Sequence, residues 1–382
     1  MRKSIVYLWV TLLCLSFSTS IETIKAYSTE RIRVNVGFKG EPDPLLIEAY
    51  NGEIIYDFTG FIPVITCYLA QDAIDVLKQH PDIEYVLVDG EVRMTGEVLP
   101  WGVQRIRANL VWDRDGDLVV DEGANAGANV TVAVLDSGID YDHPDLEDNV
   151  IGGKSCVPYT SDYMDDNGHG THVAGTIAAV DNDIGVIGVA PRVWLYGVKV
   201  VRSGGVGLVS ELVAGIKWSI LQDADIVSMS LAHPDDDPTL YQAIVDANNV
   251  GILLVASAGD VSYYGNVITY PAKYEEVIAV GSVNQSNLRD ERFSPTGPEL
   301  ELVAPGVDIY STYWDDTYAT DSGTSFAVPH VSGAAALIFA SQIPYLYDEN
   351  DNGEWENYEV REKLRDTAIF WHETLRTWLQ KP

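Results

Sequence analysis

Cysteine is scarce in this chain. Its 382 residues include three cysteines, Cys14, Cys67 and Cys156, which lie far apart in the sequence. Small disulfide-stapled domains need more cysteines, and cysteine-based zinc sites need closely spaced pairs. The sequence therefore excludes both, and stability must come from packing or from an ion bound by other residues.

Basic residues are also few. The 24 Lys and Arg residues face 57 Asp and Glu residues, which gives a formal net charge of −33. A surface of this sign repels nucleic-acid phosphates and anionic membranes, so we expect neither as a partner. Apolar residues make up 46% of the chain, as in a large globular protein of one or two domains.

Long apolar runs are missing except at the N-terminus. There, Arg2 and Lys3 precede an apolar run over 5–17 and the small residues Ser18 to Ser20. This order is that of a secretory signal peptide, and the run is shorter than the roughly 20 residues of a membrane-spanning helix. We therefore expect an exported protein from which residues 1–20, or 1–26, are removed. A signal anchor or a buried helix is the alternative.

Residues 31–95 differ in pattern from the rest of the chain. Apolar residues alternate from Ile32 to Phe38, and a second apolar run covers 63–69, which predicts two strands. Residues 73–79 fit a helix and residues 85–88 fit a further strand. This βαββαβ-like order predicts a small N-terminal domain without an evident active site.

From Leu99 onward, expected strands alternate with expected helices. The apolar, β-branched run 130–135 ends at Asp136-Ser-Gly, as a buried parallel strand ends in a turn. Further strands are expected at 226–231, 252–256 and 277–283, and helices at 171–179, 209–221, 238–248 and 324–340. This alternation predicts a parallel sheet covered on both faces, with its ligand crevice at the carboxyl ends of the strands, where Asp136 lies.

Three motifs carry groups suited to nucleophilic catalysis. They are Asp136-Ser-Gly-Ile-Asp140, Asn167-Gly-His-Gly-Thr-His-Val-Ala-Gly175 and Ser322-Gly-Thr-Ser-Phe-Ala-Val-Pro-His330. A serine hydroxyl needs an adjacent base, and an imidazole base needs a carboxylate that fixes its tautomer. Asp136, His169 and Ser325 supply this set in the order Asp, His, Ser. That order, and the absence of a G-x-S-x-G motif, disfavour an α/β-hydrolase.

Each of these residues, taken alone, also fits a non-catalytic role. Asp136 fits an ordinary turn, His169 a loop histidine, and Ser325 a helix-capping residue. His169 and His172 also invite a metal interpretation, but the H-E-x-x-H glutamate is missing and Gly170 interrupts the helical face. The joint occurrence of three long motifs favours catalysis.

Together these motifs resemble those of the subtilisin-like serine proteases, the subtilase family. The likeness continues through residues 188–191, 196–199, 228–231, 270–274 and 277–281. It implies an α/β fold in which a three-layer parallel-sheet catalytic domain, residues 96–382, follows a small α+β propeptide domain, residues 31–95. It also implies that the propeptide chaperones folding, inhibits the enzyme and is cut away autocatalytically near Thr95-Gly96. The implied activity is peptide-bond hydrolysis through Asp136, His169 and Ser325.

The resemblance places substrate binding on two backbone segments. One segment contains Gly204, Gly205 and Gly207, and the other contains Ser230, Leu231 and Ala232. An extended peptide would lie between them as an added strand, with little sequence selectivity. The family usually has two glycines after the leucine, where this chain has Ala232 and His233, so we expect an altered first specificity pocket.

Asp260 is the sharpest departure from the family. The family has an asparagine here, whose amide donates a hydrogen bond to the oxyanion beside the backbone N–H of the nucleophilic serine, in this chain Ser325. Loss of that donor costs about 10²- to 10³-fold in kcat, a value that comes from subtilisin itself. An ionised Asp260 offers no proton and repels the developing charge, whereas a protonated one donates. We expect either low activity or activity that rises as pH falls, until His169 becomes protonated.

Calcium is the cofactor that the resemblance implies. The family's site corresponds here to oxygen atoms of Glu97, Asp145, Val180, Asn182, Ile184 and Val186. Independently, residues 348–359 match an EF-hand loop. Its candidate ligands are Asp348, Asn350, Asn352, Glu354 and Glu359, with Gly353 at the turn. Pro344 and Tyr345 stand where an entering helix belongs, so a solvated acidic turn is the alternative. Asp113, Asp115 and Asp117 with Asp121 form a weaker second candidate, because Leu118 and Ala124 replace the glycine and the glutamate.

Two functions from different classes fit these features. The first is a secreted, calcium-stabilised serine endopeptidase, a monomer that acts on polypeptides and has its own propeptide as partner. The second is a catalytically impaired, protease-like peptide-binding protein, suggested by Asp260 and by the altered clamp. By the same resemblance, residues 369–382 stand where the family has a closing strand and helix, and we expect either a short substitute helix or a less stable catalytic domain.

Overall fold

The structure is a computed structural model that describes residues 31–90 and 96–368. The chain divides into two compact units, Met1–Met94 and Thr95–Pro382. The expected signal peptide, the Thr95 side of the expected processing bond, and the expected helix within 369–382 lie outside the described residues.

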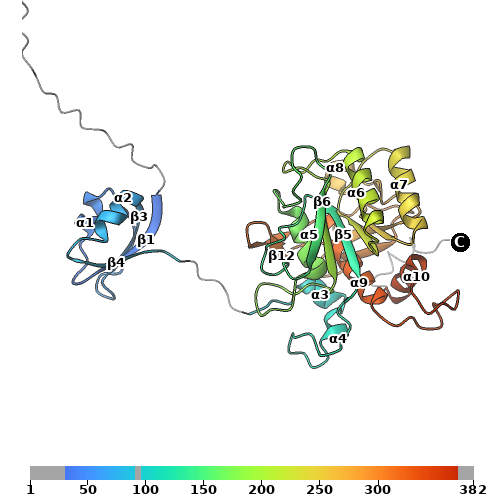
Figure 1. Cartoon of the computed structure of the whole chain (residues 1–382), viewed down its shortest axis with the longest axis horizontal. Helices are drawn as coiled ribbons and strands as arrows, with labels where there is room; N and C mark the ends of the chain where they lie inside the picture. Colours follow the sequence, from blue (N-terminus) through green and yellow to red (C-terminus); the bar gives the residue numbers. More distant parts are fainter. Residues whose placement is uncertain (1–30, 91–95, 369–382) are drawn as a thin grey trace, which may run out of the picture. The chain divides into compact units, whose positions relative to one another are not determined.

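The first unit is a four-stranded antiparallel sheet with two helices (Figure 1). Its elements are β1 (Arg31–Phe38), α1 (Pro44–Ala49), β2 (Glu53–Asp57), β3 (Val64–Ala70), α2 (Gln71–Leu77) and β4 (Ile83–Val88), and the strand order is β2-β3-β1-β4. Alternate residues of β1, including Val34 and Val36, pack with Ile74 and Leu77 of α2 in a core of its own. The chain order of these elements is the βαββαβ predicted from the sequence.

The second unit is built on a seven-stranded parallel sheet, in the order β11-β10-β9-β8-β5-β7-β6. Its strands are β5 (Thr131–Asp136), β6 (Val150–Ser155), β7 (Trp194–Lys199), β8 (Ile226–Met229), β9 (Leu253–Ser257), β10 (Val277–Val283) and β11 (Leu302–Pro305). A two-stranded antiparallel hairpin joins β12 (Ile309–Tyr313) to β13 (Thr317–Asp321). The predicted α/β fold with a parallel sheet is confirmed.

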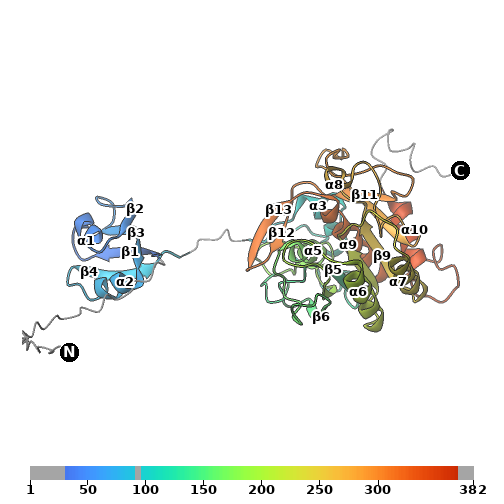
Figure 2. The ribbon, with the colours of Figure 1, turned by 90° about the horizontal axis from the view of Figure 1, so that it is seen from above.

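Helices cover both faces of this sheet (Figures 1 and 2). They are α3 (Trp101–Arg105), α4 (Asn109–Trp112), α5 (His169–Ala178), α6 (Val209–Leu221), α7 (Pro238–Asn249), α8 (Val261–Tyr264), the 3₁₀ turn η1 (Thr324–Phe326), α9 (Val328–Phe339) and α10 (Asn357–Thr367). Alternate side chains of β5 enter two different cores: Val132 and Val134 pack toward α5, α9 and α10, and Ala133 and Leu135 toward α6 and α7. The result is a helix–sheet–helix sandwich.

One predicted helix is divided in the structure. The sequence predicts a continuous helix over 324–340, but η1 ends at Phe326 and α9 starts at Val328. Pro329 lies in the first turn of α9, where its missing N–H is tolerated and a longer helix would lose a hydrogen bond. Ser325 therefore lies in a tight turn ahead of the helix.

Within 31–90 and 96–368, no helix is long and apolar enough to cross a membrane.

Ile177 on α5 tests the packing of this sandwich. Its side chain is fully buried in the core, so Ile177→Ala should lower the free energy of unfolding by about 2–5 kcal/mol. Leu221→Ala, at a position 67% exposed, is the control and should change it by no more than about 0.5 kcal/mol. Denaturant unfolding of both in a Ser325→Ala background avoids self-digestion; equal losses would contradict the assigned core.

Candidate active site

Asp136 ends β5, a central strand of the sheet. The residue is 2% exposed, and its Oδ1 accepts a hydrogen bond from the Ser137 backbone N–H at 2.7 Å. The Nδ1 atom of His169 lies 2.8 Å from the same oxygen. The structure therefore joins the first two predicted site residues in one hydrogen bond, at the carboxyl edge of the sheet as expected.

His169 opens α5, and the loop before it is held by a buried carboxylate. Asp165 accepts hydrogen bonds from the backbone N–H groups of Asn167 (2.9 Å) and Gly168 (3.0 Å), and from the N–H and hydroxyl of Thr171. Gly168 has φ +98°, and a Cβ there would meet the Tyr313 ring at 2.3 Å, so glycine is required. The sequence interpretation did not single out Asp165, whose only signal is its place just before the histidine motif.

The surroundings of His169 act in opposite directions on its pKa. Burial lowers the pKa of the imidazole, but the charge and hydrogen bond of Asp136 raise it, and Asp165 and Asp321 add to that effect. The net pKa lies above the ordinary histidine value. A protonated His169 is stabilised by these carboxylates, which is what a base that becomes cationic during reaction requires.

Ser325 lies in η1 and forms two reciprocal hydrogen bonds with Ser230. The Ser325 hydroxyl donates to the Ser230 carbonyl at 3.2 Å, and the Ser230 hydroxyl donates to the Ser325 carbonyl at 2.7 Å. The next residue, Phe326, packs against His169, with 5.2 Å between the centroids of the two rings. Ser325 therefore directly precedes a residue whose ring packs against His169, which is itself hydrogen-bonded to Asp136.

Asp260 follows β9 and contacts the residue before Ser325. Its Oδ1 accepts hydrogen bonds from the backbone N–H (3.2 Å) and hydroxyl (3.1 Å) of Thr324. Burial raises the pKa of Asp260, and the Thr324 hydrogen bonds offset part of that rise. The carboxyl group therefore lies next to the serine turn and acts as a hydrogen-bond acceptor there.

The two predicted substrate-binding segments have well-defined backbones. Residues 204–207 form a turn with Gly205 at φ +76°, closed by the bridge between Val201 and Gly207. On the other segment, the Ser257 hydroxyl donates to the Leu231 carbonyl at 3.1 Å, and the Tyr264 hydroxyl donates to the Ala232 carbonyl at 3.2 Å. The Tyr264 contact had no signal in the sequence.

The predicted calcium residues gather around Asp145. Its Oδ2 accepts hydrogen bonds from the Val186 N–H and the Tyr318 hydroxyl, both at 2.9 Å, while its buried Oδ1 has no partner among the described residues. The Asn182 N–H donates to Glu97, and burial, with the charges of nearby aspartates, raises the Glu97 pKa to about 7. An unsatisfied buried carboxylate oxygen and a second crowded carboxyl group are what a hard cation would satisfy.

The segment 180–186, between α5 and β7, completes this group. The Val180 N–H donates to the Asp145 carbonyl, the Ile184 N–H donates to the Asn182 side chain, and Val186 pairs with Val98. The donor set fits calcium.

The loop 348–359 folds around its own side chains. Asp348 accepts from the backbone N–H groups of Asn352 and Gly353, and buried Glu359 accepts from those of Glu349 and Glu356. The amides of Asn350 and Asn352 both donate to Glu356, and the Asn352 carbonyl oxygen accepts from Glu354 N–H. These hydrogen bonds order the loop, and Glu356 is a further carboxylate in it that the sequence interpretation did not include.

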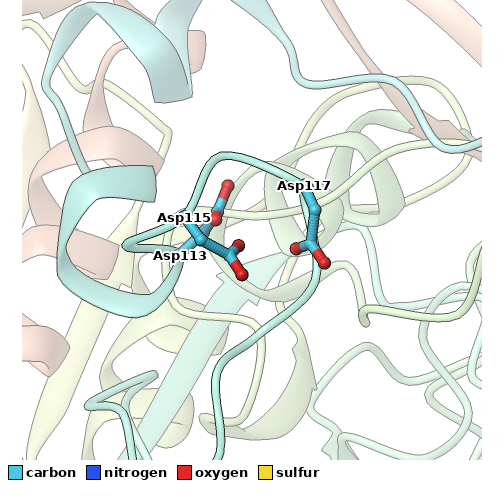
Figure 3. A group of neighbouring side chains, drawn as sticks. All are labelled: Asp113, Asp115 and Asp117. Atoms are coloured by element: carbon cyan, nitrogen blue, oxygen red, sulfur yellow. The ribbon is translucent and has the colours of Figure 1, made fainter.

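The weaker candidate loop also brings carboxylates together. Ligand atoms of Asp113, Asp115 and Asp117 lie within 4.8 Å of one another (Figure 3). Asp113 is buried and accepts from the N–H groups of Gly116 and Leu118, so its charge is already partly satisfied by the loop. Asp121 instead accepts from the Arg114 N–H.

Lys199 is a buried cation beside the site that the sequence interpretation missed. It ends β7, opposite Asp136 in the β5–β7 register, and its side chain is fully buried. Its Nζ donates to the Ser137 carbonyl and to Asp166, at 2.5 Å from the latter. The sequence offered little signal for this role, because Lys199 lies in a segment without a clean apolar pattern.

Comparison with known proteins agrees with this geometry. The model of the subtilase family matches residues 127–380. An alkaline protease of Alkalihalobacillus alcalophilus is 42% identical over 316 residues, covering 83% of this chain and 76% of that protein. Subtilisin E of Bacillus subtilis (strain 168) is 39% identical over 381 residues, covering 95% of this chain and 94% of the relative. A thermostable alkaline protease of Halalkalibacterium halodurans is 40% identical over 323 residues, covering 85% and 82%.

The fold, the site and these relatives define a serine endopeptidase. The chain belongs to the subtilase family.

Asp260→Asn should distinguish the effect of an ionised Asp260 carboxylate from that of a protonated Asp260 carboxyl group. At pH 8 the ionised carboxylate offers no proton to an oxyanion, so the variant should exceed wild type in kcat/KM by about 10- to 10³-fold. Burial raises the Asp260 pKa, so a growing fraction is protonated as pH falls, and the ratio of wild type to variant should rise from pH 9 to pH 5. Because Asp260 and His169 interact, the pH profile of each enzyme is measured separately before the ratio is taken. A ratio that is constant with pH contradicts the expectation.

Proposed function

We propose that this protein is an exported serine endopeptidase in which Asp136, His169 and Ser325 form the catalytic triad. The observation that carries the proposal is the 2.8 Å contact between the His169 Nδ1 and the buried Asp136 carboxylate, beside the turn that holds Ser325. A histidine oriented by a buried carboxylate next to a serine turn is the arrangement that activates a hydroxyl group.

The proton transfers assign a role to each group. His169 Nε2 takes the proton of the Ser325 hydroxyl as the oxygen attacks the scissile carbonyl, and then gives it to the leaving amine. Asp136 holds the Nδ1–H tautomer and stabilises the imidazolium. Before attack, the Ser325 hydroxyl turns from the Ser230 carbonyl toward His169. The oxyanion then faces the Ser325 N–H and, when protonated, the Asp260 carboxyl group.

Substrate polypeptides would bind by their backbones. Gly204, Gly205 and Gly207 on one side, and Ser230, Leu231 and Ala232 on the other, would accept the peptide as an additional strand. The Tyr264 hydroxyl donates a hydrogen bond to the Ala232 carbonyl and so fixes the second segment.

The first 95 residues would serve export and activation. Residues 1–20, or 1–26, would act as a signal peptide, and residues 31–95 as a propeptide that assists folding and inhibits the enzyme. The separate core of the first unit supports this division, as does the alignment with Subtilisin E over 95% of the chain. Cleavage near Thr95-Gly96 would release a secreted, monomeric enzyme spanning residues 96–382.

Calcium is the proposed cofactor. Glu97, Asp145 and Asn182 would bind the ion through side chains, and Val180, Ile184 and Val186 through carbonyl oxygens. The orphaned Asp145 Oδ1 supports this assignment. A second ion would be held by Asp348, Asn350, Asn352, Glu354 and Glu359. Bound calcium neutralises clustered carboxylates and so stabilises the fold; it supplies no step of the peptide hydrolysis.

A specific observation also favours a second candidate, an impaired peptide-binding protein. The Asp260 carboxylate accepts two hydrogen bonds from Thr324, an arrangement that stabilises its ionised form and removes an oxyanion donor. Without that donor, the same clamp would hold peptides and cleave them slowly.

Self-processing separates the two candidates. When the chain is expressed without residues 1–26, wild type should release the segment that ends near Thr95, and Ser325→Ala should stay full length. A fluorophosphonate probe should label wild type and the control Ser262→Ala, which changes an exposed serine, but not Ser325→Ala. The binding protein is favoured if intact mass spectra show no processing and no labelling in any of the three.

Calcium should raise the thermal stability of the Ser325→Ala protein. An ion present at about 100 times its Kd contributes about 2.7 kcal/mol, or about 5 °C in Tm for a protein of this size. Asp145→Asn and Glu359→Gln should each reduce that shift. The control Asp148→Asn, which removes an exposed charge, should keep it. Scanning calorimetry with calcium and with a chelator measures the shift; equal shifts in all variants would contradict both sites.

A further inference from the structure

Asp321 is held beside the first turn of α5 by the β12–β13 hairpin. It is the last residue of β13, and its partner in β12 is Ile309. The Ile309 carbonyl lies 3.0 Å from the Nε2 of His172, which is three residues after His169 on α5. Figures 1 and 2 both show this hairpin next to α5. The backbone thus fixes Asp321 near His169 and four residues before Ser325.

The Asp321 carboxylate is exposed and available to a ligand. Its Oδ1 accepts a hydrogen bond from the Ser322 backbone N–H at 2.7 Å, and among the described residues no lysine or arginine forms an ion pair with it. The negative charge of Asp321 acts electrostatically on the site, because it contributes to raising the pKa of His169 and of Asp260. A cation bound near Asp321 would therefore meet an uncompensated negative field.

The chemistry decides which part of a substrate meets this field. His169 returns its proton to the amine that leaves, so the leaving segment must lie on the His169 side of Ser325. The proposed clamp for the other segment includes Ser230, which exchanges hydrogen bonds with Ser325, and Ala232. Asp321 lies with His169, on the leaving-group side.

We propose that Asp321 is a specificity-determining residue that selects lysine or arginine at the position directly after the scissile bond. The flexible stem and charged head of such a side chain reach a surface carboxylate while the backbone stays in the clamp. This proposal rests on the proposed triad. It makes cationic polypeptides the preferred substrate class and gives one of the many surface carboxylates a role in catalytic selection.

The proposal is tested with three fluorescence-quenched peptide substrates. They differ only in the residue directly after the scissile bond, which is Lys, Gln or Glu. Wild type should cleave the Lys peptide with a kcat/KM about three- to fivefold above the Gln peptide, the size of an exposed ion pair, and the Glu peptide more slowly still. Asp321→Asn keeps the acceptor for the Ser322 N–H and should reduce the Lys-to-Gln ratio to about one. High salt should reduce it in wild type.

Two controls separate local selection from the overall charge. Asp246→Asn removes an exposed charge on α7 and should keep the wild-type ratio. A second peptide series, with Lys or Gln directly before the scissile bond, should respond equally in wild type and Asp321→Asn.

Each outcome is decisive. Cleavage with the same Lys-to-Gln ratio in wild type and Asp321→Asn overturns the role of Asp321 and leaves the triad intact. If Asp246→Asn loses the Lys-to-Gln ratio as fully as Asp321→Asn does, the selection comes from the net charge of the protein, and the role of Asp321 is also overturned. No cleavage of any peptide, together with no fluorophosphonate labelling of Ser325, overturns the proposed function itself.

Discussion

A buried carboxylate at the end of a central strand governs the organisation of the active-site edge. Asp136 is surrounded by the sheet and exposes almost none of its surface, so its charge must be met by hydrogen bonds inside the protein. The Ser137 N–H and the His169 ring meet one oxygen of the carboxylate. Three features then place the His169 ring: the first turn of α5, the loop held by Asp165, and Gly168.

The acidic residues fall into physically different groups. Asp165 is buried and satisfied, since hydroxyl and backbone donors meet both of its oxygens. Asp145 is buried and, like Asp136, has one oxygen without a partner among the described residues, but it also lies close enough to the Glu97 carboxyl group to raise its pKa, so two crowded carboxyl groups favour a cation there. Asp321 is exposed and accepts a hydrogen bond from the Ser322 backbone N–H. The net charge of −33 therefore does not describe one property of the molecule.

The strongest sequence patterns predicted the fold well. The strand at 277–283 was located to the residue, because an unbroken apolar run suits a strand buried on both faces. The strands β6 and β7 were not predicted: β6 contains Gly152 and Gly153, and β7 contains Tyr196 and Lys199, so neither has a clean apolar pattern. Their positions depend on pairing within the sheet, which local propensity does not encode.

The sequence alone determined the family, the parallel-sheet fold class and the three motifs that supply Asp136, His169 and Ser325, because each depends on residue identity and local order. Tertiary structure decided which charges meet. Asp260 and Thr324 are 64 positions apart, and Lys199 and Ser137 are 62 apart, yet both pairs are hydrogen-bonded. Such contacts are set by where strands end and how helices pack over them, so only the folded chain reveals whether a carboxylate is satisfied, orphaned or free to select a substrate.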